Sequence, residues 1–258
     1  MAASAALFFL VPTIALLAAA AAAAGVSNVE AVTYPVINMA PGTKGGIVFD
    51  TQIGLNFTTN TMSAASDFSW QTFQQNTSAD RRSLPQISLF IDSDIQGIAY
   101  HDYQAAQIYI DADYLANFTS NGSSSSADEL RREFAGLVYG QMASVWGWNG
   151  NGTAPAGLLS GIGDYVRGKA GYEPKNNHTT TSYYEWAEAG EGEKWDQGDD
   201  VTARFLEYCD GLRNGSFVAE INSMMKDTYS SGFFVELLGK DVADVWKDYK
   251  AKYGNLTA

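Results

Sequence analysis

The chain has 258 residues, and its 29 acidic and 16 basic side chains leave a formal net charge of −13 at pH 7. This charge repels nucleic-acid backbones and anionic membranes, so we expect no nucleic-acid partner and no stable membrane association. A hydrophobic content of 46% excludes a disordered chain. The only histidines and cysteine are His101, His178 and Cys209, so a zinc site with three His or Cys ligands would need all of them.

The first 24 residues predict a signal peptide. Residues 1–29 have no charged side chain, and an apolar stretch over residues 7–17 leads into alanines 18–24. Small residues at the end of such a stretch suit cleavage by signal peptidase. A transmembrane anchor is the alternative, but alanine is a weak membrane residue and no basic cluster follows. We therefore expect a secreted protein whose mature domain spans residues 25–258.

The glycosylation sequons agree with export. The pattern Asn-x-Ser/Thr occurs eight times, which predicts a glycoprotein that faces the secretory lumen. The acceptor residues are Asn56, Asn76, Asn117, Asn121, Asn151, Asn177, Asn214 and Asn255. A single cysteine is unusual in that compartment. Its apolar neighbours Phe205, Leu206 and Leu212 predict that Cys209 is a buried structural thiol.

The first half of the mature chain is predicted to be mostly β-structure. Short strands are expected at residues 32–34, 46–49, 86–91 and 106–110, the last two of which alternate polar and apolar residues. One helix is expected between them, near residues 60–75. His101 falls between two predicted strands, where a loop position is favoured over a general base paired with Asp102. His178 lies in a polar sequon and is expected to be exposed.

The second half is predicted to be helical. Ser126 and Glu129 have the spacing of a capping box, and apolar residues then recur every three or four positions until the turn at 149–152. Further helices are expected over residues 157–170, 199–213, 215–228 and 240–252. Strands first and helices afterwards indicate a single α+β domain.

Several segments of the second half together resemble the plant basic secretory protein family, whose members look like zinc metallopeptidases. The segments are residues 139–152, 160–167, 194–198, 200–206, 233–240 and 248–254. The resemblance extends from about Val32 to Gly254. It implies a zincin-like single domain, in which an N-terminal twisted β-sheet precedes a helical half that contains the zinc helix. It also implies an extracellular setting in the apoplast or cell wall, with a role in plant defence.

In that family the helix carries His-Glu-x-x-His, and the next helix begins its motif with a ligating glutamate. Two histidines one turn apart can bind one Zn²⁺, and the glutamate beside the first activates the bound water. This chain departs at all four places. Gly140 and Ser144 stand at the histidine positions, Gln141 at the catalytic glutamate and Ser160 at the ligating glutamate. Only Asp164, which in the family orients a histidine, remains.

These departures predict a pseudopeptidase without zinc, cofactor or catalytic residues. Aromatic side chains near the former active-site segments are candidates for a cleft that binds a peptide or a cell-wall glycan. They are Trp146, Trp148, Tyr165, Trp186 and Trp195, although core packing is the favoured alternative for the first two. Two other functions remain open: residual hydrolysis at a site without zinc, such as His101 with Asp102, and a structural or storage glycoprotein. The charge of −13 argues against cationic attachment to acidic cell walls.

Overall fold

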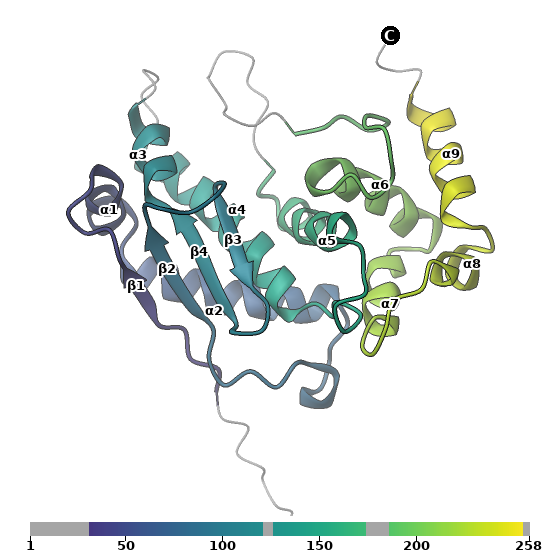
Figure 1. The fold of residues 1–258 in the computed structure, drawn as a ribbon, viewed down its shortest axis with the longest axis horizontal. Coiled ribbons are helices and arrows are strands. Elements are labelled where there is room, and N and C mark those ends of the chain that lie inside the picture. The colour runs from purple at the N-terminus through teal and green to yellow at the C-terminus, as the bar shows by residue number, and fades with distance from the viewer. Residues whose placement is uncertain (1–30, 121–125, 174–185, 255–258) are drawn as a thin grey trace, which may run out of the picture. The chain divides into compact units, whose positions relative to one another are not determined.

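The computed structural model describes residues 31–120, 126–173 and 186–254, which belong to one compact unit. A four-stranded sheet lies in the first half of the chain, and helices make up the second half (Figure 1). The predicted α+β class and the order of strands before helices are therefore confirmed. Within these residues no helix has both the length and the apolar character needed to cross a bilayer. The predicted signal peptide, residues 1–24, lies outside the described residues.

The sheet has the strand order β1-β2-β4-β3. Its strands are β1 (Val36–Asn38), β2 (Ser88–Asp92), β3 (Ala99–Asp102) and β4 (Gln107–Asp111). The first three strands in this order run parallel, and β3 is antiparallel to β4 at the edge, with Tyr100 opposite Tyr109. β3 thus follows β2 in sequence but occupies the side of the sheet nearest the helical half (Figure 1).

Nine α-helices and two short helical turns accompany the sheet in the described residues. The N-terminal set is α1 (Lys44–Val48), the π-turn η1 (Phe49–Ile53), α2 (Leu55–Thr72), the 3-10 turn η2 (Ser78–Asp80) and α3 (Ala112–Ser120). The C-terminal set is α4 (Ala127–Trp146), α5 (Ala156–Lys169), α6 (Asp199–Leu212), α7 (Phe217–Met224), α8 (Gly232–Leu238) and α9 (Val242–Tyr253). Helices α2 and α4 pack against each other behind the sheet, and α5 packs between α4 and α6.

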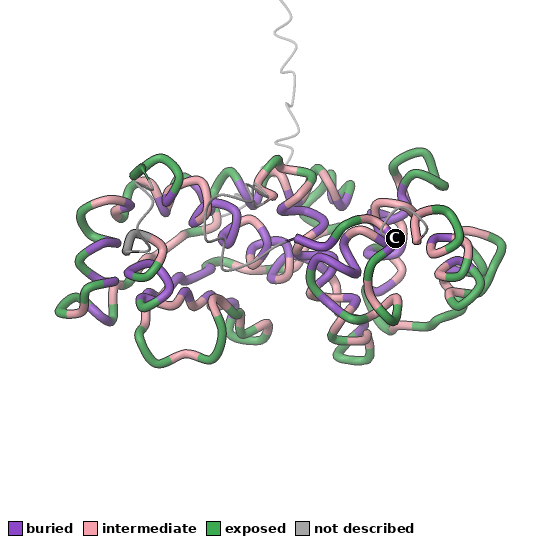
Figure 2. Tube along the Cα trace, turned by 90° about the horizontal axis from the view of Figure 1, so that it is seen from above, coloured by how far each residue is buried: buried purple, intermediate pink, exposed green. Residues whose placement is uncertain are grey.

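The core lies between the sheet and the helices behind it. Alternate strand residues, including Leu89, Ile91 and Ile108, are completely buried. From α4, Phe134 and Val138 are equally buried. Figure 2 shows buried segments running through the interior, with exposed segments around them. Burial of these side chains stabilises the fold by roughly 1.5–3 kcal/mol each.

Helix α4 begins where its sequence predicts. The Ser126 hydroxyl accepts a hydrogen bond from the Glu129 amide, and the Glu129 carboxylate accepts one from the Ser126 amide. This capping box satisfies two amide groups that the first turn of a helix leaves without partners. The predicted Cys209 environment is also confirmed, because the thiol is buried and burial raises its pKa well above the usual value.

Several local predictions are wrong. Residues 46–49 belong to α1 and η1 rather than a strand, because the Thr43 hydroxyl caps α1 and Gly45 packs too closely on α3 for any side chain. A Cβ on Gly45 would lie 1.7 Å from the Ala112 carbonyl oxygen. Residues 32–34 form only an isolated bridge through Thr33, and the strand starts at Val36. Strand β3 and helices α3 and α8 were not predicted.

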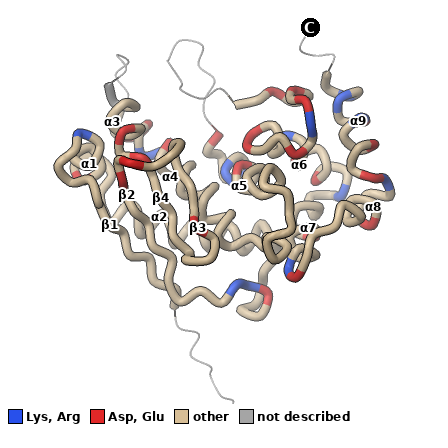
Figure 3. Tube along the Cα trace, viewed as in Figure 1, with Lys and Arg blue, Asp and Glu red and all other residues tan. Residues whose placement is uncertain are grey.

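Acidic residues occur at the C-terminal ends of β2 and β4 and in α6 (Figure 3). Asp92 and Asp111 end the two strands, while Asp199 and Asp200 form the first turn of α6. Carboxylates in a first turn interact favourably with the helix dipole. The start of α6 therefore brings negative charge to the rim of the cavity described next.

Candidate functional site

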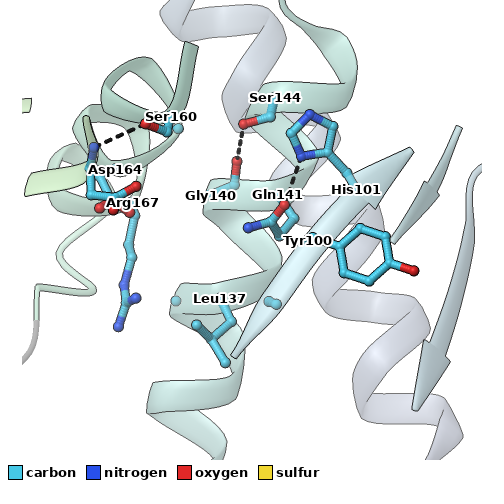
Figure 4. A pocket seen from close by; sticks show the side chains of 13 residues that line it. Tyr100, His101, Leu137, Gly140, Gln141, Ser144, Ser160, Asp164 and Arg167 are labelled. Atoms are coloured by element: carbon cyan, nitrogen blue, oxygen red, sulfur yellow. Dashed lines mark hydrogen bonds between the residues drawn. The ribbon is translucent and has the colours of Figure 1, made fainter. Parts of the chain in front are cut away.

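A cavity of about 220 Å³ lies between strand β3 and helices α4 and α5. All five positions that the family motif assigns to metal chemistry line it: Gly140, Gln141, Ser144, Ser160 and Asp164 (Figure 4). The first three come from one face of α4, and the other two come from α5. The fold thus brings together two segments that the resemblance treats as one site. We call this cavity the cleft.

The positions that correspond to metal ligands in the family hold either no side chain or a hydroxyl group that bonds to nearby backbone atoms. Gly140 has no side chain, and a Cβ added there would meet its nearest atoms at 3.6–3.8 Å, an ordinary contact distance. The Ser144 hydroxyl donates to the Gly140 carbonyl oxygen at 3.1 Å. The Ser160 hydroxyl accepts a hydrogen bond of 3.0 Å from the Asp199 amide at the start of α6. Both serines therefore serve local structure.

Helices α4 and α5 meet closely at the floor of the cleft. A Cβ on Gly163 would lie 2.8 Å from the Ser144 hydroxyl oxygen and 3.0 Å from the Gly140 carbonyl oxygen. Since real Cβ atoms rarely come so near, glycine at position 163 sets how closely the two helices pack. This spacing fixes the distance between the α4 and α5 positions of the motif.

Gln141 has a partner that the sequence did not predict. Its side-chain oxygen lies 2.8 Å from Nδ1 of His101, which reaches over from β3 (Figure 4). An amide oxygen only accepts hydrogen bonds, so Nδ1 carries the proton and Nε2 is left with its lone pair. Burial lowers the pKa of His101, while the hydrogen bond that it donates to Gln141 acts in the opposite direction. His101 is therefore neutral at physiological pH.

The favoured interpretation of His101 as a loop residue is wrong. His101 lies within β3 and lines the cleft. The Asp102 carboxylate instead accepts hydrogen bonds from the backbone amides of Gln104 and Ala105 in the following turn. One signal in the sequence could have located His101. Residues 99–102 are separated by only a short turn from residues 107–110, so the two segments can pair as a hairpin that places His101 opposite Ile108.

Asp164 matches the family motif and lies in the cleft, and its surroundings favour the protonated form of its carboxyl group. Burial raises the pKa of Asp164 to about 7, with further increases from Asp199, Asp200 and Glu133, while Arg167 opposes the shift. Arg167 does not neutralise Asp164, because its guanidinium is paired with Glu133 at 2.9 Å. Two other polar side chains that by type could pair with Asp164 are also bonded elsewhere. Tyr165 donates to Asp210, and Gln141 is paired with His101.

With this geometry established, comparison with known proteins identifies the family. A family model described as "Peptidase of plants and bacteria" matches residues 29–249. The chain belongs to this family. A relative from Boswellia serrata, named "Basic secretory protease", is 39% identical over 61 residues, which are 24% of this chain and 69% of that relative. The predicted membership of the basic secretory protein family is confirmed. No solved structure matches the chain.

The zinc ion that the family resemblance implies does not fit the side chains in this cleft. Zn²⁺ prefers imidazole, thiolate and carboxylate ligands in a tetrahedral arrangement. Throughout residues 31–120, 126–173 and 186–254, no three His, Cys, Asp or Glu side chains come together as a metal site. Among the residues that line the cleft, His101, Asp164 and Asp199 are the ones with such donor groups. His101 keeps a free lone pair on Nε2, but it does not come together with Asp164 and Asp199 as a three-ligand metal site.

Three of the five aromatic binding candidates belong to the core rather than to the cleft. Trp146, Tyr165 and Trp186 are each exposed by 3% or less. The Trp146 ring nitrogen donates to Ser66, and Trp186 packs between Arg167 and Arg204. Trp146 ends α4 and Tyr165 lies on α5, so both are buried on the apolar faces of these helices, whereas Trp186 is buried in the segment before α6. The assignment of these three side chains to a binding cleft is therefore corrected.

The other two aromatic candidates differ. Trp195 is half-buried and packs edge-on against Phe234, 5.3 Å between ring centres, so it also serves the core. Trp148 follows the end of α4 and lines two further cavities. The smaller, about 50 Å³, shares His101 and Ser144 with the cleft. The larger, about 260 Å³, shares Trp148 and Asn222 with the smaller one. The three cavities therefore adjoin one another.

Five of the eight predicted glycosylation sites lie within the described residues, and all five asparagines are exposed. They are Asn56, Asn76, Asn117, Asn151 and Asn214. Exposure is what attachment of a glycan requires. The sequons at Asn121, Asn177 and Asn255, together with His178, lie outside the described residues.

Proposed function

We propose that this protein is a secreted member of the basic secretory protein family that has lost zinc peptidase activity and keeps the cleft as a peptide-binding groove. One observation carries the proposal. The four positions at which the family places its ligands and its base come together in the cleft, but they hold Gly140, Gln141, Ser144 and Ser160. Without a bound metal, water loses the shift of roughly 8–9 pKa units that makes it a nucleophile at neutral pH.

Strand β3 supplies the argument for a peptide ligand. The Asp111 amide donates to the Ile98 carbonyl oxygen, which makes these two residues a hydrogen-bonded pair of the antiparallel ladder. Bonded and non-bonded pairs alternate, so Ala99 and His101 turn their backbone N–H and C=O groups away from β4. Both residues line the cleft. An extended peptide could therefore add to β3 as a fifth strand and gain main-chain hydrogen bonds.

Secretion and glycosylation are part of the same proposal. They are supported by the uncharged N-terminal stretch, by the eight sequons and by the exposure of the five asparagines described above. The family resemblance adds an extracellular, defence-related setting, in which a groove without catalysis would capture a peptide rather than cleave it. A cell-wall glycan is the alternative ligand for this role.

Residual hydrolysis is a second candidate function, favoured by one observation. His101 and Asp164 line the same cavity, and the pKa of Asp164 is about 7, within the range in which a general acid or base operates. This pairing replaces the earlier pairing of His101 with Asp102. A structural or storage glycoprotein would have neither activity nor a saturable ligand.

Peptide binding and cleavage by the purified secreted protein distinguish these functions. We expect saturable binding to a library of extended fluorescent peptides and no cleavage products by mass spectrometry. The variant Ala99→Pro removes one outward N–H without removing a bond to β4, so binding should weaken about fivefold or more. Peptides N-methylated on their backbone are the matched control and should also bind poorly to the unaltered protein.

Two results would contradict the proposal. Cleavage abolished by His101→Ala or Asp164→Asn would establish the residual hydrolase instead. Peptide binding that is equally strong in the Ala99→Pro variant would show that β3 is not the docking strand, provided that thermal unfolding shows both proteins folded.

A further inference from the structure

A row of stacked aromatic rings crosses the sheet and ends at strand β3. Tyr100 of β3 lies opposite Tyr109 of β4, and Phe90 of β2 lies opposite the same tyrosine. The ring centres of Tyr100 and Tyr109 are 4.7 Å apart, with 6° between the ring planes. Those of Tyr109 and Phe90 are 5.0 Å apart, with 19° between the planes. We call these three side chains the aromatic row.

The aromatic row lies on the face of the sheet that is turned away from the helices. Leu89 and Ile108, the neighbours of the row along their strands, are completely buried, and successive side chains of a strand point to opposite faces. Helices α2 and α4 cover the face of these buried residues (Figure 1). Tyr100 is 42% exposed and belongs to the last strand at its edge of the sheet. Within the described residues, Tyr109 is the only aromatic ring that packs on Tyr100.

The rings repeat at the spacing of the strands. Neighbouring strands of a sheet lie about 4.7–4.9 Å apart, close to the distances between the ring centres. A peptide added to β3, as in the proposed function on which this inference rests, would place one side chain beside Tyr100 at a similar distance. Ala99 and His101 turn their backbone groups outward, so Tyr100 would form a non-hydrogen-bonded pair with an antiparallel peptide. Side chains come closest in such pairs.

The charges around the row favour a basic peptide. Residues 86–113 include five aspartates but no lysine or arginine. Asp102 comes two positions after Tyr100, on the same face of β3, and is exposed. Arg82 contacts the turn that follows β3, but its guanidinium is already bonded to two backbone carbonyl oxygens. A peptide side chain opposite Asp102 would therefore meet a carboxylate that has no basic partner among the described residues.

We propose that β3 selects extended peptides with an aromatic residue opposite Tyr100 and a basic residue two positions away, opposite Asp102. The aromatic residue extends the row by one ring, and cross-strand aromatic and opposite-charge pairs both stabilise a sheet. A saccharide could also stack on Tyr100. A peptide is favoured because it alone offers a regular series of N–H and C=O groups to the outward backbone of Ala99 and His101.

Fluorescence anisotropy with three labelled pentapeptides, capped at both ends, tests this selection on the secreted protein. Lys-Thr-Tyr-Thr-Lys has the proposed pattern in either chain direction. Lys-Thr-Ala-Thr-Lys lacks the ring, and Glu-Thr-Tyr-Thr-Glu reverses the charges. We expect the first peptide to bind at least about threefold more tightly than either of the others, because each of them loses one class of cross-strand pair.

Variants of the protein assign the selection to named side chains. Tyr100→Thr keeps a residue suited to a strand but removes the ring, so the preference for tyrosine over alanine in the peptide should disappear. The alanine peptide should bind this variant as it binds the unaltered protein. Asp102→Asn should reduce the preference for lysine over glutamate. Ile37→Thr is the matched control and should change nothing, because Ile37 is 40% exposed and opposite Phe90, but lies at the other edge of the sheet.

Failure of this inference can be told apart from failure of the proposed groove. If all three peptides bind equally and Ala99→Pro weakens them all, β3 docks peptides without selecting them, and the inference is overturned. A preference for tyrosine that persists in Tyr100→Thr, or is lost in Ile37→Thr, overturns it as well. If no peptide binds, or if Ala99→Pro has no effect, the proposed groove fails and the inference with it. Binding of cellotetraose that depends on Tyr100, without peptide binding, would assign the row to a glycan instead.

Discussion

The cleft and the cavity of about 260 Å³ beside Gln75, Trp148 and Asn222 are similar in size but differ in how the polar side chains around them are satisfied. In the cleft, Gln141 is bonded to His101, and both serines are bonded to backbone groups. Beside the larger cavity, the buried Gln75 side chain has no hydrogen-bond partner, and the Asn222 side-chain nitrogen also lacks one. The polar side chains at the family motif positions are thus internally satisfied, whereas these two buried amides are not.

If the cleft has lost a metal site, as we propose, the remaining polar side chains have found partners within the protein. At two of the positions that the family resemblance assigns to ligands, the Ser144 hydroxyl bonds to a carbonyl oxygen of its own helix and the Ser160 hydroxyl bonds to the Asp199 amide at the start of α6. Asp164 responds differently, because burial keeps it protonated up to a pH of about 7 rather than giving it a new ion pair. The predictions below test each part of this contrast.

The largest effect is expected from rebuilding the metal site with Gly140→His, Gln141→Glu, Ser144→His and Ser160→Glu. The two α4 positions lie one helical turn apart, and position 140 has room for a side chain. Metal analysis of the purified variant should find one zinc per chain, with a binding free energy on the order of 10 kcal/mol. The same variant without Ser160→Glu is the control and should bind zinc more weakly. A folded fourfold variant that binds no zinc would show that the cleft has lost the family geometry.

A smaller effect concerns Asp164 and pH. Its pKa in the folded protein, about 7, lies above the unfolded value, so the folded state binds an extra proton between about pH 4 and 7. Its contribution to stability is present at low pH and is lost as the pH rises through 7. Between pH 5 and pH 8 this loss should be about 3 kcal/mol.

Urea unfolding at several pH values measures this effect. Asp164→Asn should remove most of the decline, and Asp227→Asn, at an exposed position, should leave it unchanged. An unchanged slope in Asp164→Asn would mean that Asp164 is ionised in the folded protein.

The same substitution in the two cavities should have opposite effects on stability. Gln141→Leu leaves the buried Nδ1 proton of His101 without an acceptor, which should lower the free energy of unfolding by about 1–3 kcal/mol. Gln75→Leu removes a buried amide that has no partner, so it should be neutral or stabilise by up to about 1 kcal/mol. Urea unfolding of both variants gives the comparison. A change of the same sign and size in both would remove the distinction between the cavities.

The helical half could be predicted well from the sequence because its signals are local. The capping box of Ser126 and Glu129 and the apolar spacing that follows it locate α4, and the predicted limits of α5 and α6 are within a residue of those observed. The sheet was predicted less well, because its strands are short and depend on distant partners. β3 has only four residues, and its pairing with β4 is what shows that it is a strand.

The positions in the cleft could be predicted, but their contacts could not. The family motif located residues 140, 141, 144, 160 and 164 correctly in one cavity. The partner of Gln141 is His101, 40 residues away, which only the packing of β3 on α4 reveals. The buried amides of Gln75 and Asn222 left no signal in the sequence, since only the packing shows that they are buried without a full set of partners.

Zinc titration of the purified, secreted protein is the most direct test of whether the cleft has lost its metal site. After removal of bound metal by a chelator, we expect no saturable zinc binding by calorimetry and no zinc retained after dialysis. We also expect added zinc to leave the temperature of thermal unfolding unchanged. One tightly bound zinc per chain, with a rise in unfolding temperature, would contradict the conclusion that the cleft has lost its metal site.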